Sequence, residues 1–217
     1  STWDCKVSSL KYYSEDINSP IVAPVANAGT NGVAIGDGAL VTGGRSMAFG
    51  ANSSADKESV VLGNNNQSAN SYNTITGNSN IVNSDWTFLS GYGNNISSGS
   101  ENIISAINTT MAHAYRTLVS GVANVFNGSI YEENQIVGNN NTIQGNLYLT
   151  QILGNQNTIN PTTKINSIVG NFNTFTGGDE SAVVGHYNTT DASRAFIVGY
   201  NLTNNLSGSV DLGTDNA

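Results

Sequence analysis

The side chains of this sequence that could do chemistry are scattered acids, hydroxyls and two histidines. Nucleophilic catalysis needs a serine or cysteine beside a histidine that an acid orients, and the sequence offers no such set at a sensible spacing. His113 and His186 stand far apart, and neither has a second histidine at a metal-binding spacing. We therefore predict a protein that is not an enzyme and uses no cofactor or metal.

Paired carboxylates leave one alternative open. Enzymes that cleave glycosidic bonds hold two carboxyl groups about 5 to 9 Å apart, and neighbouring turns of a coiled chain could bring two acids together. The second hypothesis is therefore a carbohydrate-binding or carbohydrate-cleaving β-helix, as in phage tail spikes. The acids fall mostly in predicted corners: Asp56, Glu58, Asp85, Glu101, Glu132, Glu133, Asp179, Glu180 and Asp191.

A repeat sets the elements that position these side chains. QIVGNNNTI begins at Gln135, QILGNQNTI at Gln151 and SIVGNFNTF at Ser167, so near-copies recur at an equal interval. Self-similarity at a fixed period indicates a repeat architecture. The residue that closes each apolar run gives a register mark, and the marks follow one another at a nearly constant spacing: Gly36, Gly50, Gly63, Gly77, Gly91, Ala106, Gly121, Gly138, Gly154, Gly170, Gly185, Gly199 and Gly213.

Other positions keep step with these marks. An apolar residue stands two positions before each of the first twelve marks, another often stands five after, and asparagine recurs three after. Each turn of the chain, here called a rung, therefore predicts two short strands around an Asn-Gly corner, where both residues accept positive φ cheaply. We predict an all-β parallel β-roll of about thirteen rungs, each of roughly 13 to 17 residues. The stacked rungs would form a rod roughly 58 Å long. Apolar side chains should form ladders inside it, and asparagines should form ladders at the corners.

The strands before the marks are often apolar at three consecutive positions, as in VAI at Val33, MAF at Met47 and FIV at Phe196. Alternation would be expected if one face met water, so an unbroken run indicates burial on both faces. The thin interior of the roll covers only one face. Burial of the second face therefore requires a partner. We expect that partner to be another copy of the chain in a closed symmetric oligomer.

Composition narrows the function classes. The 217 residues are 38% hydrophobic and 10% charged, with a net charge of −8. This balance argues against nucleic acid, which needs clustered Lys and Arg. Cys5 is the only cysteine, so no disulfide forms within one chain, although an interchain bridge stays open. No run of about 18 apolar residues predicts a membrane span, and no signal peptide is visible.

The segment NGVAIGDGALVTGGRSMAFGANSSADKESVVLG, which ends at Gly63, resembles the head of the trimeric autotransporter adhesins, the YadA-like family. The motif of that family is a small residue, then VAIG, then a short turn, with a period near 14. The match is close over Gly32 to Gly63 and Ser181 to Gly213 and looser between. In the middle rungs Thr76, Ser90, Ser105 and Ser120 replace a branched residue, and rungs from Gly121 to Gly170 are longer, which predicts protruding loops.

The resemblance implies a left-handed β-roll, homotrimeric, at the exposed tip of a type V secreted fibre on the bacterial outer membrane. It implies a non-enzymatic adhesin head that binds host matrix proteins such as collagen or fibronectin, or immunoglobulin-like host receptors, or mediates autoaggregation in biofilms. Members of the family continue into a stalk and a C-terminal membrane anchor, both absent from this sequence. The resemblance implies that contact with the membrane is made only through that anchor.

We divide the chain into an N-terminal cap or lead-in, residues 1–31, and the β-roll head, residues 32–217. Loops carry function more often than the scaffold does, and tyrosines are frequent hot spots of protein recognition. The alternative is that these side chains fold back over neighbouring rungs. The candidate ligand-binding residues are Trp86, Tyr115, Tyr131, Glu132, Glu133, Leu147 and Tyr148.

Overall fold

The computed structural model describes residues 31–131, 133–144, 146–160, 163–164 and 166–215. The predicted cap apart from Asn31, together with Cys5 and Glu132, lies outside these residues. Within the described part of the chain every regular element is a β-strand and none is a helix.

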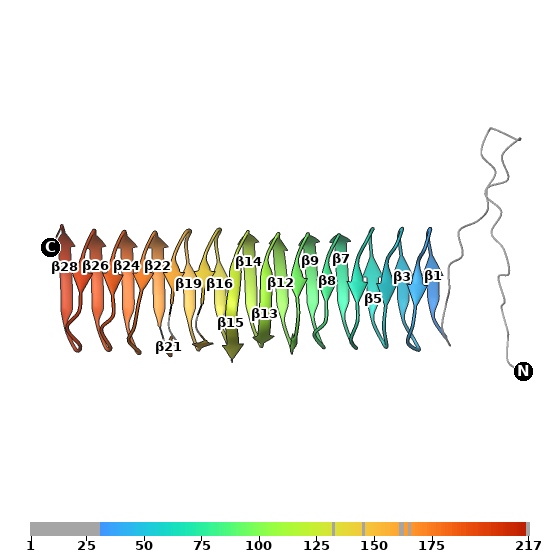
Figure 1. The fold of residues 1–217 in the computed structure, drawn as a ribbon, viewed down its shortest axis with the longest axis horizontal. Helices are drawn as coiled ribbons and strands as arrows, with labels where there is room; N and C mark the ends of the chain where they lie inside the picture. Colours follow the sequence, from blue (N-terminus) through green and yellow to red (C-terminus); the bar gives the residue numbers. More distant parts are fainter. Residues whose placement is uncertain (1–30, 132, 145, 161–162, 165, 216–217) are drawn as a thin grey trace, which may run out of the picture.

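The first sheet contains 13 parallel strands stacked from one end of the rod to the other (Figure 1). They are β1 (Val33–Ile35), β3 (Met47–Phe49), β5 (Val60–Leu62), β7 (Thr74–Asn78), β9 (Phe88–Tyr92), β12 (Ile103–Ile107), β14 (Leu118–Val122), β16 (Gln135–Val137), β19 (Gln151–Leu153), β22 (Ser167–Asn171), β24 (Ala182–His186), β26 (Phe196–Tyr200) and β28 (Val210–Thr214).

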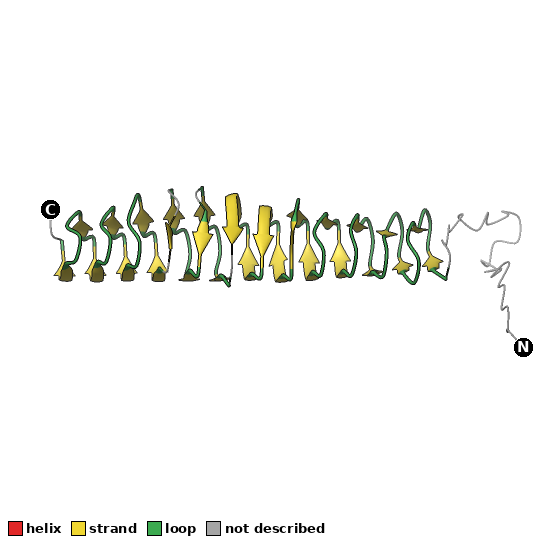
Figure 2. Cartoon of the chain, turned by 90° about the horizontal axis from the view of Figure 1, so that it is seen from below, coloured by secondary structure: helices red, strands yellow, loops and turns green. Residues whose placement is uncertain are grey.

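The second sheet contains 15 strands, and Figure 2 shows the two sheets as two layers joined by loops. Its main path is β2 (Leu40–Val41), β4 (Ser54–Ala55), β6 (Gln67–Ser68), β8 (Ile81–Val82), β10 (Asn95–Ile96), β13 (Thr110–Tyr115), β15 (Val125–Tyr131), β17 (Thr142–Ile143), β20 (Thr158–Ile159), β23 (Thr174–Phe175), β25 (Thr189–Thr190) and β27 (Thr203–Asn204). Off this path lie β11 (Gly99–Ser100), β18 (Leu147–Tyr148) and β21 (Thr163–Lys164).

The repeat positions decide which residues stack. Residues two before the marks pair across the first sheet, as Ile75 with Leu89 and Ile136 with Ile152. Every strand pairing is parallel and joins successive coils of the chain. The predicted all-β, parallel β-solenoid is therefore confirmed.

The core lies between the two sheets. Ile75 and Leu89 from the first sheet and Val82 and Ile96 from the second are all completely buried. One strand of three to five residues buries too little alone, and stacking joins these side chains into a continuous apolar cluster along the rod. The predicted apolar ladders are confirmed.

The outer face of the first sheet is uncovered in the single chain. In β3 the middle residue Ala48 is buried, while its neighbour Met47 is 44% exposed. The three-residue apolar runs therefore alternate between the core and the outside, and burial of their second face would need another molecule.

The longer rungs do not form the protruding loops that their length predicted. Their extra residues extend the second sheet instead: Tyr131 pairs with Tyr148, and Tyr148 pairs with Lys164. The expectation of loops is wrong for the described residues, because neighbouring long rungs supply backbone partners for one another's extra segments.

Every mark except Ala106 is glycine, and most of these positions favour glycine for two reasons. Gly77 has φ 118°, and a Cβ there would stand 1.8 Å from the carbonyl oxygen of Gly91 in the next rung. Backbone conformation and stacking distance both exclude a side chain.

Candidate functional site

The Asn corner is the turn that leaves each first-sheet strand, from the mark to the third residue after it. Its asparagines at the third position are buried: Asn66, Asn80, Asn94, Asn124, Asn141, Asn157, Asn173 and Asn188. The Nδ2 of Asn157 donates to Asn141 Oδ1 at 3.1 Å and to the Gly170 carbonyl at 2.9 Å. The predicted Asn ladder is confirmed, and its hydrogen bonds are directed into the scaffold.

Thr109 interrupts this ladder. Its backbone N–H donates to Asn94 Oδ1 at 2.9 Å, but its buried Oγ1 has no hydrogen-bond partner. An unpaired buried hydroxyl costs free energy, so this rung is a weak point of the Asn corner.

The opposite turn, which enters each first-sheet strand, carries a different chemistry. We call it the charged-aromatic corner and define it by the residues five before the marks. Apart from Asn31 and Gly208, the described members are bulky and adopt φ between 47° and 62°, a region that such residues rarely occupy: Arg45, Glu58, Tyr72, Trp86, Glu101, Arg116, Glu133, Leu149, Glu180 and Arg194. Large side chains at such positions point to selection for what they present.

Trp86 is the most prominent side chain of this corner. Its indole stacks on the Tyr72 ring of the preceding rung, with centroids 4.1 Å apart and planes 9° from parallel. It nevertheless stays 58% exposed, and Phe88 beside it is 49% exposed. Trp86 therefore packs on the preceding rung, not the following one, and one part of the ring stays accessible.

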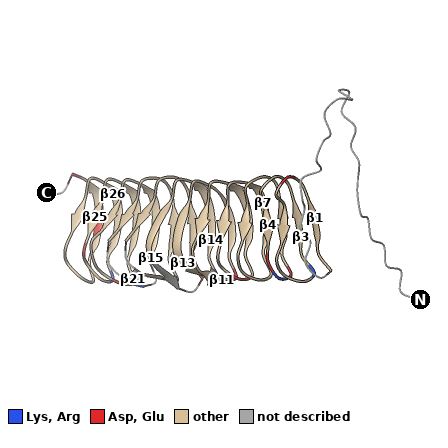
Figure 3. Cartoon of the chain, turned by 45° about the vertical axis from the view of Figure 1, so that its right-hand side comes forward, with Lys and Arg blue, Asp and Glu red and all other residues tan. Residues whose placement is uncertain are grey.

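Charges gather along the same edge (Figure 3). Arg45 pairs with Glu58, and Arg116 Nη1 lies 3.7 Å from Glu133 Oε1. Solvent-exposed ion pairs contribute little to stability, so these side chains shape the surface more than they hold the fold.

The predicted contact residues mostly lie on this edge. Tyr131 and Tyr148 occupy paired positions of adjacent rungs, and Lys164 Nζ lies 5.8 Å from the Tyr148 ring centroid. Tyr115 is 37% exposed. Leu147, in contrast, is completely buried in the core, so it offers no surface to a ligand and does not belong in the set.

Sequence reasoning left three residues of this edge out of the candidate ligand-binding set, namely Tyr72, Lys164 and Glu101, the last of which it named only among the corner acids. The signal existed: aligning the chain on the marks puts Tyr72 and Glu101 in the same column as Trp86. The residues of that column differ in type, so similarity between side chains did not reveal it.

A second aromatic cluster lies at the Asn corner near the C-terminal end. The Phe172 and Tyr187 rings stack with centroids 4.7 Å apart, and Tyr200 meets Tyr187 edge-on at 5.6 Å. Its flanks are polar amides and His186, whose Nδ1 lies 3.2 Å from Asn171 Nδ2.

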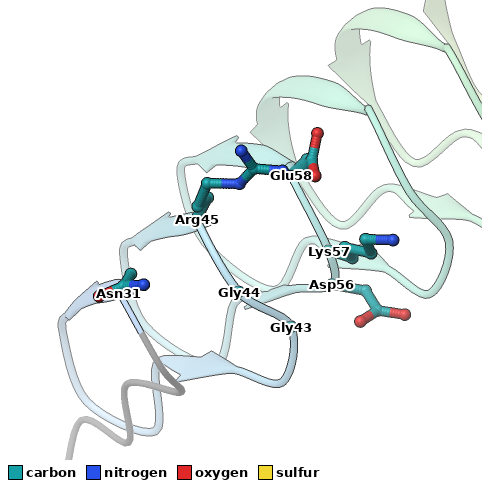
Figure 4. Close-up of a pocket in the computed structure, with 7 residues that line it drawn as sticks. All are labelled: Asn31, Gly43, Gly44, Arg45, Asp56, Lys57 and Glu58. Atoms are coloured by element: carbon teal, nitrogen blue, oxygen red, sulfur yellow. Dashed lines mark hydrogen bonds and ion pairs between the residues drawn. The ribbon is translucent and has the colours of Figure 1, made fainter.

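A shallow hollow near the first rungs is lined by Asn31, Gly43, Gly44, Arg45, Asp56, Lys57 and Glu58. Figure 4 shows Arg45 reaching toward Glu58, with Asp56 and Lys57 on the same rung as Glu58. Thr42 Oγ1 donates to Asp56 Oδ1 at 3.3 Å. Its charges are largely satisfied and its walls polar, unlike a typical small-molecule site.

Among the described residues, no three His, Cys, Asp or Glu side chains are grouped to hold a metal ion. The described segments also contain no helix long and apolar enough to cross a membrane. The chain matches no known family model, and no curated protein matches it at a significant level.

Proposed function

We propose that this chain is the non-enzymatic head of a trimeric adhesin on a bacterial surface, a left-handed β-roll with rungs of about 13 to 17 residues. Three copies lie side by side with the outer faces of their first sheets together. The charged-aromatic corners then face outward and bind host matrix proteins or immunoglobulin-like receptors. In this proposal the head sits at the tip of an outer-membrane fibre.

The observation that carries the proposal is an apolar strip along the first sheet. Its exposed members run from the first rung to the last: Val33, Ile35, Met47, Leu62, Phe88, Ile103, Leu118, Val137, Val169, Val184, Phe196, Val210 and Leu212. Monomeric soluble proteins rarely expose apolar side chains along one face over such a length, even though the outward Thr74 and Thr76 of β7 interrupt them. The strip therefore supports a covering partner of equal length.

A second copy of the same chain fits that requirement best. A rod of the same length presents the same strip, so identical copies can cover one another in closed symmetry. The number three comes from the resemblance to the adhesin heads. Three chains would carry a charge of −24 (3 × −8), which favours solubility of an otherwise weakly charged rod.

Solution mass tests the assembly directly. One chain weighs 22.6 kDa, and light scattering should give three times that mass. A mass of one chain at micromolar concentration would contradict the proposal.

A matched pair of variants locates the interface. Leu62 on the first sheet is 40% exposed and Ile81 on the second sheet is 39% exposed. Leu62→Glu should reduce the mass toward that of one chain, because three carboxylates would be forced into an apolar interface. Ile81→Glu should leave the mass unchanged; an equal effect of both would place the interface elsewhere.

Binding to immobilised collagen, fibronectin and immunoglobulin-like receptors tests the adhesive role. Tyr131→Ala and Tyr148→Ala should weaken capture of a ligand that the unaltered trimer binds, and three copies make the effect larger through avidity. Trimers that bind no member of such a panel, or that cleave glycans, would redirect the function.

A further inference from the structure

The edge of the rod around Trp86 has a chemistry more specific than general adhesion. Asp85 pairs with Ser100 across the second sheet, which places Glu101 in the rung directly after Trp86. The Glu101 backbone N–H donates to the Asp85 carbonyl at 3.3 Å, and the Trp86 N–H donates to the Ser71 carbonyl at 3.2 Å. Tyr72, Trp86 and Glu101 are thus consecutive members of one corner.

The two faces of the Trp86 indole differ. Tyr72 covers the face on the side of the preceding rung. The opposite face is turned toward the following rung, where the exposed Glu101 stands. A ligand group that reached this face would contact the indole and the carboxylate together.

The carboxylate of Glu101 is uncommitted. In the described segments it makes no hydrogen bond or ion pair, whereas Glu58 pairs with Arg45, and Glu133 lies beside Arg116. Asp85 adds a second carboxylate, whose Oδ1 accepts the Ser71 N–H at 2.9 Å. Two carboxylates therefore stand on the rung of Trp86 and the following rung, and Arg116, one rung further, lies 3.7 Å from Glu133.

We propose that Trp86 and Glu101 form a binding site for an arginine side chain of a protein partner. The guanidinium stacks on the uncovered face of the indole and donates to the Glu101 carboxylate. Tryptophan is the best aromatic acceptor for a cation. A guanidinium is planar, always charged and able to bond a carboxylate in bidentate fashion, which an ammonium cannot do.

The proposed arginine site lies on the corner that the proposed function uses for adhesion. Its biological role rests on that proposed function. The backbone at Trp86 is compatible with it. Its φ of 51° suits Asn or Gly, the residues that prevail at the Asn corner, so the local fold does not require an aromatic side chain there.

The test uses the full 217-residue chain carrying Trp3→Phe, so that fluorescence reports Trp86 alone. The probe is the peptide acetyl-Gly-Arg-Gly-amide, compared with its lysine and citrulline counterparts. Arginine should change the Trp86 emission in a saturable way, lysine should bind more weakly, and the neutral citrulline at least about tenfold more weakly. Raising the salt concentration should weaken arginine binding.

Variants separate the site from the fold. Glu101→Gln should weaken arginine binding about tenfold or more while leaving the unfolding midpoint unchanged. Trp86→Asn, followed by calorimetry, should abolish it. Tyr187→Asn is the matched control, because Tyr187 is also a stacked aromatic at positive φ, but the next rung of its column carries Asn201. That variant should bind arginine normally.

Three results would overturn the inference: equal binding of citrulline, unchanged affinity in Glu101→Gln, or displacement of the peptide by a neutral oligosaccharide, which would make the ring a sugar platform. Its failure is distinguishable from failure of the proposed function. A trimer that binds host ligands but ignores the arginine peptide loses only this site. A single chain that captures no host ligand but binds the peptide keeps the site and loses the adhesin role.

Discussion

The two corners of each rung share a backbone conformation and differ in what they do with it. Asn140 at the Asn corner and Glu133 at the charged-aromatic corner have φ of 55° and 56°. At the Asn corner, amides turn inward and bond from rung to rung, as Asn157 does to Asn141. At the other corner, the side chains five before the marks point to solvent and pair loosely or stack. The residues that follow them are buried and also bond from rung to rung, as the Thr87 N–H does to Asn73 Oδ1.

The exposed column of the charged-aromatic corner therefore differs from the buried columns at both corners, which hold adjacent rungs together. Amides buried at the Asn corner satisfy backbone groups that water cannot reach, so their loss is costly. Exposed pairs at the charged-aromatic corner contribute little. Substitutions at the two corners should therefore affect different measurements.

The largest expected effect is at the Asn corner. Asn157→Leu removes two donated hydrogen bonds and leaves the N–H of Asn173, 3.0 Å from Asn157 Oδ1, without its acceptor. We expect a loss of about 3 to 5 kcal/mol in the free energy of unfolding, measured by urea denaturation at fixed protein concentration.

The control for this variant is Asn140→Gly at the exposed position just before Asn141. Glycine keeps the positive φ, so the change should stay within about 0.5 kcal/mol. Equal losses in both variants would mean that the ladder does not carry the stability of the corner.

Repairing the ladder should give the next largest effect. Thr109→Asn supplies an amide that can donate to Asn94 Oδ1 and to the Gly121 carbonyl, as the equivalent Asn94 does one rung earlier. We expect a gain of about 1 kcal/mol, seen as a higher urea midpoint. Thr110→Asn, on the exposed side of the same turn, should bring no gain. A destabilised Thr109→Asn chain would refute the repair.

Trp86→Asn should change stability by less than about 1 kcal/mol, because the lost stacking on Tyr72 is offset by relief of an unfavourable backbone conformation. Trp86→Val should be clearly less stable than Trp86→Asn, since a β-branched residue is poorly tolerated at this φ. Thermal unfolding of the pair checks this, and equal stabilities would show that the backbone there is not strained.

The smallest expected effect belongs to the exposed charges. Glu133→Gln keeps the shape of the side chain and removes its attraction to Arg116 at 3.7 Å. The unfolding free energy should shift by less than about 0.5 kcal/mol. A loss above about 1 kcal/mol, the upper end for an exposed pair, would show that this corner also supports the fold.

Much of the scaffold could be predicted from the sequence because stacking repeats the same side-chain requirement in each rung. Most members of the Ile75 column are apolar, most of the Gly77 column lack a Cβ, and most of the Asn80 column reach two neighbours. These requirements select similar residues, and similarity at fixed spacing is readable. The all-β coil and its core followed from them.

The site was less predictable for the opposite reason. At the charged-aromatic corner the backbone is fixed by its neighbours' hydrogen bonds, as when Trp86 donates to Ser71, while the side chain is free to vary. Conformation is shared there but residue type is not. Trp86, Tyr115 and Tyr148 were found as isolated aromatics, whereas Glu101 was named only among scattered acids and Tyr72 was not singled out, although alignment on the marks places both in the Trp86 column. Leu147 was misjudged because its long rung widened the sheet and drew it inside.

Because adjacent strands stand about 4.8 Å apart, the charged-aromatic corner exposes one residue of every rung at a regular interval. The side chains of these residues do not pack in the core. Single residues at this edge can therefore be substituted without disturbing the buried core. Evolution could therefore change the residues that this edge presents, within the limits set by their positive φ, while the fold is preserved.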